Sequence, residues 1–104
     1  MDLIKIRKEN KLVDLFCTLA EIPSPSLKEE NVANWIKKYC DENNIPCEFD
    51  GYHNIYINIP ATEPEKPSLL LSSHMDVIGD DSPVKPYLDG DLIRAEGRTL
   101  GADD

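Results

Sequence analysis

The chain has 104 residues, of which 20 are acidic and 11 basic, giving a formal net charge of −9. This length allows at most one small domain with a modest core. The negative charge argues against a nucleic-acid or anionic-membrane surface as the main partner, so neither partner is expected. The three cysteines form no Cys-x-x-Cys pair and the N-terminus lacks the apolar region of a signal peptide, so a cytoplasmic location is predicted.

Two amphipathic helices are expected at the start of the chain. The first has one apolar stripe at helical spacing, formed by Leu12, Leu15, Phe16 and Leu19. Pro23 and Pro25 end it, because proline lacks a donor and restricts the residue before it. Ser26 and Glu29 are spaced as a capping box for the second helix. Its apolar stripe is formed by Val32, Trp35, Ile36, Tyr39 and Cys40, all expected in the core.

Strand patterns follow Pro46. An alternating segment, Ile55 to Ile59, is expected to pair with Cys47–Phe49 across a turn in which His53 is solvated or locally bonded. The continuous apolar run Leu69–Leu71 predicts a central strand, covered on both faces and ending at His74. Further along, Tyr87-Leu88 and Leu92-Ile93 flank Asp89-Gly90 as in a β-hairpin.

His74 and Asp76 form the main candidate site. Residues two apart on a strand point to one face, so both side chains can project from the strand's carboxyl end. An imidazole can bind a metal through one nitrogen while a carboxylate holds the other N–H. A hydrogen-bonded structural histidine is the alternative from this triplet alone. Asp103 and Asp104, at the end of the sequence, add two carboxylates beside small residues.

These segments together resemble a known family. Ser73-His74-Met75-Asp76, Val84-Lys85-Pro86, Asp89-Gly90 and Thr99 to Asp104 are similar, in this order and at these separations, to the N-terminal part of the peptidase T-like tripeptidases. These belong to a zinc-dependent family with carboxypeptidase G, aminoacylases and succinyl-diaminopimelate desuccinylase. Ile22 to Ser26 and the turn with Asn54 match as well, so the resemblance runs from about Leu12 to the end of the sequence.

The resemblance implies roles for three residues. His74 matches the histidine that binds one of two zinc ions, and Asp103 matches the aspartate that bridges both. Asp76 matches the catalytic-site aspartate that orients the histidine. The implied cofactor is Zn²⁺, with two ions in the complete enzyme, and the implied substrate is a short peptide. The substrate-binding residues are unknown, and a homodimer is expected only for the complete enzyme.

The resemblance also implies that residues 1–104 are part of a catalytic domain. The expected fold is α/β, the N-terminal portion of a zinc-peptidase domain, with two helices followed by a mixed sheet and no lid or dimerisation domain. After the double aspartate, relatives supply a Glu-Glu pair, whose first member is the general base, and further metal ligands, and no residue of this sequence matches these positions. The chain alone is therefore expected to bind zinc weakly and to be inactive.

Three alternatives remain open. Pro86 to Gly90, together with Pro60 to Thr62, also resembles aminoacyl-histidine dipeptidases, but these tend to carry asparagine where this chain has Asp104. A second alternative is a binding module that kept the fold and lost catalysis. A third is an incomplete gene product, which would expose apolar strand edges and aggregate.

Overall fold

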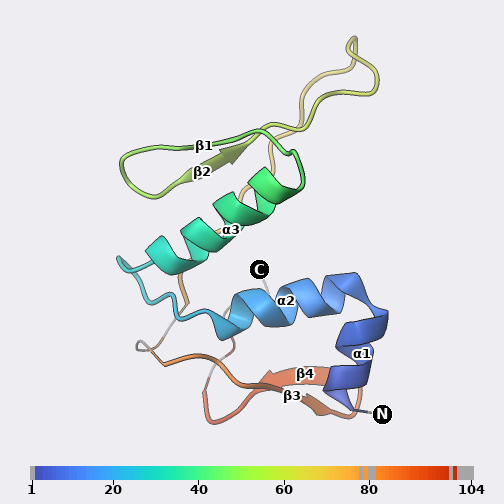
Figure 1. The fold of residues 1–104 in the computed structure, drawn as a ribbon, viewed down its shortest axis with the longest axis vertical. Helices are drawn as coiled ribbons and strands as arrows, with labels where there is room; N and C mark the ends of the chain where they lie inside the picture. Colours follow the sequence, from blue (N-terminus) through green and yellow to red (C-terminus); the bar gives the residue numbers. More distant parts are fainter. Residues whose placement is uncertain (1, 78, 80–81, 99, 101–104) are drawn as a thin grey trace.

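The fold is known from a computed structural model that describes residues 2–77, 79, 82–98 and 100. The elements within these residues are α1 (Leu3–Glu9), α2 (Lys11–Glu21), α3 (Glu30–Glu42), β1 (Cys47–Phe49), β2 (Ile55–Ile57), β3 (Pro86–Asp89) and β4 (Leu92–Ala95) (Figure 1). The strands pair as two antiparallel hairpins, β1 with β2 and β3 with β4. The predicted α/β class is confirmed.

Helix α1 was not predicted, and its ends are fixed by side-chain caps. The Asp2 carboxylate accepts a hydrogen bond from the Lys5 N–H at 2.7 Å, where the helix begins. Asn10 separates α1 from α2, and its side chain accepts from the N–H groups of Leu12 and Val13 at 3.0 and 3.2 Å. A seven-residue helix is marginal in isolation, so its stability depends on contacts with α2.

Arg7 provides the main polar contact between α1 and α2. Its Nε donates to the Asp14 carboxylate at 2.8 Å, and its Nη1 lies 3.0 Å from a Glu21 oxygen. Its Nη2 donates to the Thr18 hydroxyl at 3.2 Å. One guanidinium thus contacts three side chains along one face of α2.

Replacing Arg7 with alanine should lower the free energy of unfolding by about 1 kcal/mol, because the two carboxylates are half-exposed and solvent screens the pairs. Urea unfolding followed by circular dichroism measures this loss. Arg7→Lys should recover part of it, since a lysine keeps the charge but cannot contact three partners at once. Equal stability of Arg7→Ala and the wild type would contradict the role of Arg7 as the main polar contact between α1 and α2.

Helix α2 lies between α3 and the β3–β4 hairpin (Figure 1). The buried apolar side chains are small and come from α2, α3 and the segment before β3: Cys17, Ala20, Val32, Ala33, Cys40 and Val84. The expected burial of Val32 and Cys40 is confirmed. Trp35 is half-buried and stacks on Tyr39, with ring centroids 5.5 Å apart. The prediction for Leu12 is wrong, because it lies in the first turn of α2 and is 75% exposed.

The predicted capping box is also wrong. Helix α3 begins at Glu30, with Glu29 as its N-cap residue and no capping hydrogen bond from a side chain. The two side chains are used elsewhere: the Ser26 hydroxyl donates to Asp76, and the Glu29 carboxylate accepts from the Leu27 N–H at 2.8 Å. The chain therefore forms a turn where the sequence pattern suggested the first turn of a helix.

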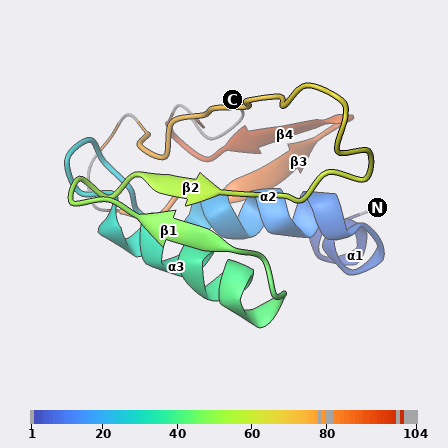
Figure 2. The ribbon, with the colours of Figure 1, turned by 90° about the horizontal axis from the view of Figure 1, so that it is seen from above.

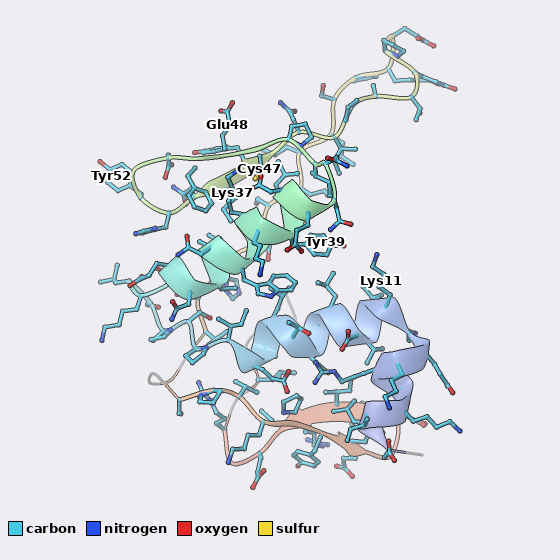
Figure 3. All side chains as sticks on the ribbon, in the orientation of Figure 1. Lys11, Lys37, Tyr39, Cys47, Glu48 and Tyr52 are labelled. Carbon is cyan, nitrogen blue, oxygen red and sulfur yellow. The ribbon has the colours of Figure 1, made fainter. Side chains whose placement is uncertain are left out.

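The β1–β2 hairpin forms as predicted and lies along α3 (Figure 2). Cys47 pairs with Ile57 and Phe49 with Ile55. Figure 3 shows Cys47 beside Lys37 of α3, with Glu48 on the opposite side of β1, as expected for successive strand residues. The predicted strand extended to Ile59, but β2 ends at Ile57 and Ile59 is 79% exposed.

The predicted central strand is wrong. Leu69, Leu70 and Leu71 are 83, 88 and 83% exposed, and the segment as far as Asp76 lies in neither sheet. A strand covered on both faces needs neighbours on both sides. Within the described residues, no backbone hydrogen bond reaches 69–72, so the sheet is not the mixed one expected.

The β3–β4 hairpin confirms the second predicted turn, displaced by one residue. Asp89 pairs with Leu92, which places Gly90 and Asp91 in the turn. Gly90 has φ +63°, a conformation that glycine adopts without strain. The Glu96 N–H donates to the Lys85 carbonyl at 3.0 Å and extends the hairpin beyond the strands.

None of the described helices has the length and apolar character needed to cross a bilayer.

Candidate metal site

His74 and Asp76 lie in contact, although no strand carries them. The His74 Nδ1 atom is 2.7 Å from the backbone carbonyl oxygen of Asp76 and 3.3 Å from its carboxylate Oδ1. A carbonyl oxygen only accepts hydrogen bonds, so Nδ1 is the atom that carries the proton. In the neutral ring this places the lone pair on Nε2, the nitrogen that would bind a metal. Both side chains are partly exposed.

The loop between α2 and α3 holds this pair in place. The Val77 N–H donates to the Ser24 carbonyl at 2.8 Å, and Pro25 and Val77 form a parallel β-bridge. The Ser26 hydroxyl then donates to Oδ2 of Asp76. Ser24 is buried, at 2% exposure, so the bond that joins the loop to Val77 starts from a residue in the interior.

The loop has its own internal support. Leu27 has φ +69°, which is unusual for a residue with a branched side chain. The Lys28 N–H donates to the Pro25 carbonyl at 2.9 Å, and the Leu27 N–H donates to the Glu29 carboxylate at 2.8 Å. These bonds stabilise the tight turn that presents Ser26 to Asp76.

The environment keeps Asp76 ionised. The hydrogen bond from Ser26 lowers the pKa of the Asp76 carboxyl, and the nearby His74 ring acts in the same direction, while partial desolvation opposes both. An ionised carboxylate near neutral pH is what a histidine-orienting group requires.

An open pocket of about 460 Å³ borders the pair. Three segments far apart in the sequence form its walls: the loop before α3, the β1–β2 turn and the segment ending at Asp76. The lining residues are Leu27, Glu29, Gly51, Tyr52, His53, Asn54, Ser73, His74, Met75 and Asp76. The predicted solvated turn residue, His53, is exposed but also lines this pocket.

Asp50 stabilises the β1–β2 turn, whose residues line the same pocket as His74 and Asp76. Its carboxylate accepts from the backbone N–H groups of Tyr52 and Asn54 at 2.8 and 3.0 Å, from Asn54 Nδ2 at 2.8 Å and from the Tyr56 hydroxyl at 3.2 Å. The side-chain bond from Asn54 is the largest cause that lowers the pKa of Asp50. The turn is therefore most stable when Asp50 is ionised.

Because the pKa of Asp50 is lowered by folding, its contribution to stability is complete above the ordinary aspartate pKa of about 3.9 and is lost as the pH falls through the lowered value. Asp50→Asn should therefore lose less stability than the wild type on acidification from about pH 5 to 2. Carboxyl-carbon NMR titration should show a larger rise in this pKa for Asn54→Ala than for Tyr56→Phe. A reversed order would contradict the assigned causes.

The donor chemistry of the pair fits a zinc ligand and its orienting group. His74 offers an imidazole nitrogen, and Asp76 holds the other ring nitrogen. Among the residues that the structure describes, no group of three or more His, Cys, Asp or Glu side chains could hold a metal. Asp103, the predicted bridging ligand, lies outside the described residues, as does Asp104. The described part thus provides one ligand position with its support.

Ser26 is the residue that the sequence patterns misassigned. Its spacing to Glu29 suggested a helix cap, whereas its hydroxyl is bonded to Asp76, fifty residues away in the chain. The one available indication was the match of Ile22 to Ser26 to the peptidase family. No local pattern links this loop to Asp76.

Comparison with known proteins finds similarity to a protein named a dipeptidase and to one named a putative hydrolase. No family model matches the chain. It is 36% identical over 105 residues to the cytosol non-specific dipeptidase of Escherichia coli, covering 88% of this chain and 21% of that protein. It is also 32% identical over 94 residues to a putative LysW-lysine/LysW-ornithine hydrolase of Pyrococcus abyssi, covering 90% of this chain and 26% of that protein. The chain thus spans about a quarter or less of these relatives.

Proposed function

We propose that this chain forms part of the catalytic domain of a zinc-dependent peptidase that cleaves short peptides in the cytoplasm. The observation that carries the proposal is the contact between His74 Nδ1 and Asp76, which places the ring proton on Nδ1 and the lone pair on Nε2. The similarity to a protein named a dipeptidase supports the peptidase class. The identity of the metal rests on the resemblance and on the donor type.

The proposed function gives His74, Asp76 and Asp103 separate roles. His74 would bind one zinc ion through Nε2, while Asp76 keeps the ring in the correct tautomer and orientation. Asp103 would bridge two ions, as the resemblance implies. Bound zinc would supply Lewis-acid activation of a peptide carbonyl and of an attacking water. The general base would come from polypeptide outside the 104 residues, because none of the matched positions supplies it.

Two substrate lengths are candidates within this class. The segments matched to the peptidase T-like family favour tripeptides, whereas the name of the Escherichia coli relative favours dipeptides. Aminoacyl-histidine dipeptides form a narrower case of the second candidate. A non-catalytic module would use the same open pocket to bind a peptide without cleaving it.

The proposal is tested on the protein isolated from its own cells with an antibody raised against this chain, so that any further polypeptide is retained. Alanine dipeptide, alanine tripeptide and alanyl-histidine are offered with and without a chelator. We expect hydrolysis that the chelator abolishes and added zinc restores, and the relative rates decide between substrates. Peptide binding without hydrolysis would favour the binding module, and neither binding nor hydrolysis would contradict the peptidase class.

A further inference from the structure

We propose that Ser26 is a positioning residue for the metal-binding nitrogen of His74, acting through Asp76. This rests on the proposed function, because it assumes that His74 Nε2 is a ligand atom. The pathway has two contacts: the Ser26 hydroxyl donates to Oδ2 of Asp76, and the other side of Asp76 faces His74 Nδ1. Ser26 itself does not line the pocket.

The oxygen atoms of Asp76 contact two different partners, Ser26 and His74. Oδ2 takes the serine hydroxyl, while Oδ1 lies 3.3 Å and the backbone oxygen 2.7 Å from His74 Nδ1. A carboxylate held at one oxygen cannot rotate freely about its side-chain bonds. The bond from Ser26 therefore keeps Oδ1 beside the imidazole, where its negative charge reinforces the Nδ1–H tautomer that the Asp76 backbone oxygen also favours.

Ser26 can hold Asp76 only because its own backbone is fixed on both sides. On the N-terminal side of Ser26, the Ser24 carbonyl accepts a hydrogen bond from the N–H of Val77 at 2.8 Å. Val77 is the residue that follows Asp76 in the chain. On the C-terminal side of Ser26, the Leu27 N–H is bonded to Glu29 and the Lys28 N–H to Pro25. The serine and the aspartate thus lie side by side on two segments that are already joined.

The alternative role for Ser26, as an N-cap of helix α3, is not the one that the structure shows. Helix α3 begins at Glu30 without a capping bond from any side chain, so loss of the Ser26 hydroxyl removes no helix contact. Ser26 is also exposed, so its replacement leaves no buried cavity. The consequence of its loss should appear at the His74 ring.

The test is ¹⁵N NMR of the zinc-free 104-residue chain at a pH where His74 is neutral, because the two tautomers have distinct ring-nitrogen shifts. The variants are Ser26→Ala, Ser26→Cys, Ser26→Thr and the control Ser68→Ala, an exposed serine in the loop before Leu69. We expect the wild type, Ser26→Thr and Ser68→Ala to keep mainly the Nδ1–H tautomer. Ser26→Ala and Ser26→Cys should lose part of it, since alanine cannot donate and a thiol donates weakly.

Zinc affinity provides the second measurement on the same variants. Ser26→Ala should weaken binding by on the order of 10-fold, the lower range for loss of an outer-shell partner, and Ser26→Thr should stay near the wild type. An unchanged tautomer ratio in Ser26→Ala and Ser26→Cys would overturn the inference, as would a Ser26→Thr variant that behaves like Ser26→Ala. If the tautomer ratio shifts but the protein isolated from its own cells shows no chelator-sensitive hydrolysis, the positioning role stands and the proposed function fails.

Discussion

Replacing His74 with alanine should weaken zinc binding to the chain by on the order of 100-fold, since loss of a ligand should cost at least as much as loss of its outer-shell support. Binding by the wild type should itself be modest, because the described residues supply one ligand position and no cluster of three. NMR titration with zinc, followed at the ring resonances of the two histidines, measures affinities in this weak range.

The matched control for this experiment is His53→Ala. His53 lines the same pocket on the β1–β2 turn, has φ +65° and has no carboxylate held against its ring in the described structure. Its removal should change zinc affinity by less than about threefold, well below the loss expected for a ligand. Equal losses in the two variants would mean that zinc is attracted by the pocket in general, and His74 would have no special role.

Replacing Val84 with alanine should lower the free energy of unfolding by about 2 kcal/mol. Val84 is 2% exposed and is the largest of the fully buried side chains, in a core made of small residues. It lies two residues before β3, the strand that contacts α2, so its burial adds apolar packing near the junction of the second hairpin and the helices. The truncation removes apolar contacts and leaves a cavity that the small neighbours cannot fill.

Urea unfolding of Val84→Ala measures this loss, and Lys85→Ala is the control. Lys85 is adjacent and exposed, so its truncation should change stability by less than about 0.5 kcal/mol. If both variants unfold at the same urea concentration, the hairpin contributes little to the core and Val84 is not the residue that attaches it.

Local patterns predicted the elements whose stabilising contacts are close in sequence. Helices α2 and α3, the Cys47–Phe49 pairing and the Gly90 turn depend on neighbours within about a dozen residues, and all formed, although Leu12 of the predicted α2 stripe is exposed. Helix α1 was missed because none of its seven residues is buried, and its attachment to α2 depends on polar contacts of Arg7 that an apolar pattern does not reveal.

Two other failures have different physical causes. Leu69–Leu71 has the composition of a buried strand, but composition does not supply hydrogen-bonded neighbours, and none of the described segments pairs with it. Ser26 satisfied a capping pattern, but Asp76 competes for its hydroxyl and is an ionised acceptor, which forms the stronger bond. His74 and Asp76 were expected on one face of a strand, but their contact forms in an irregular segment, through the backbone oxygen and the carboxylate of Asp76.

The most direct test of the metal site is X-ray absorption at the zinc edge, on the 104-residue chain loaded with an equimolar amount of zinc. The proposed site predicts nitrogen and oxygen ligands at about 2.0–2.2 Å with a histidine scattering pattern, and loss of that pattern in His74→Ala. The chain also carries three free cysteines, Cys17, Cys40 and Cys47. A first shell dominated by sulfur at about 2.3 Å would place the zinc on these thiols and contradict a His74 site.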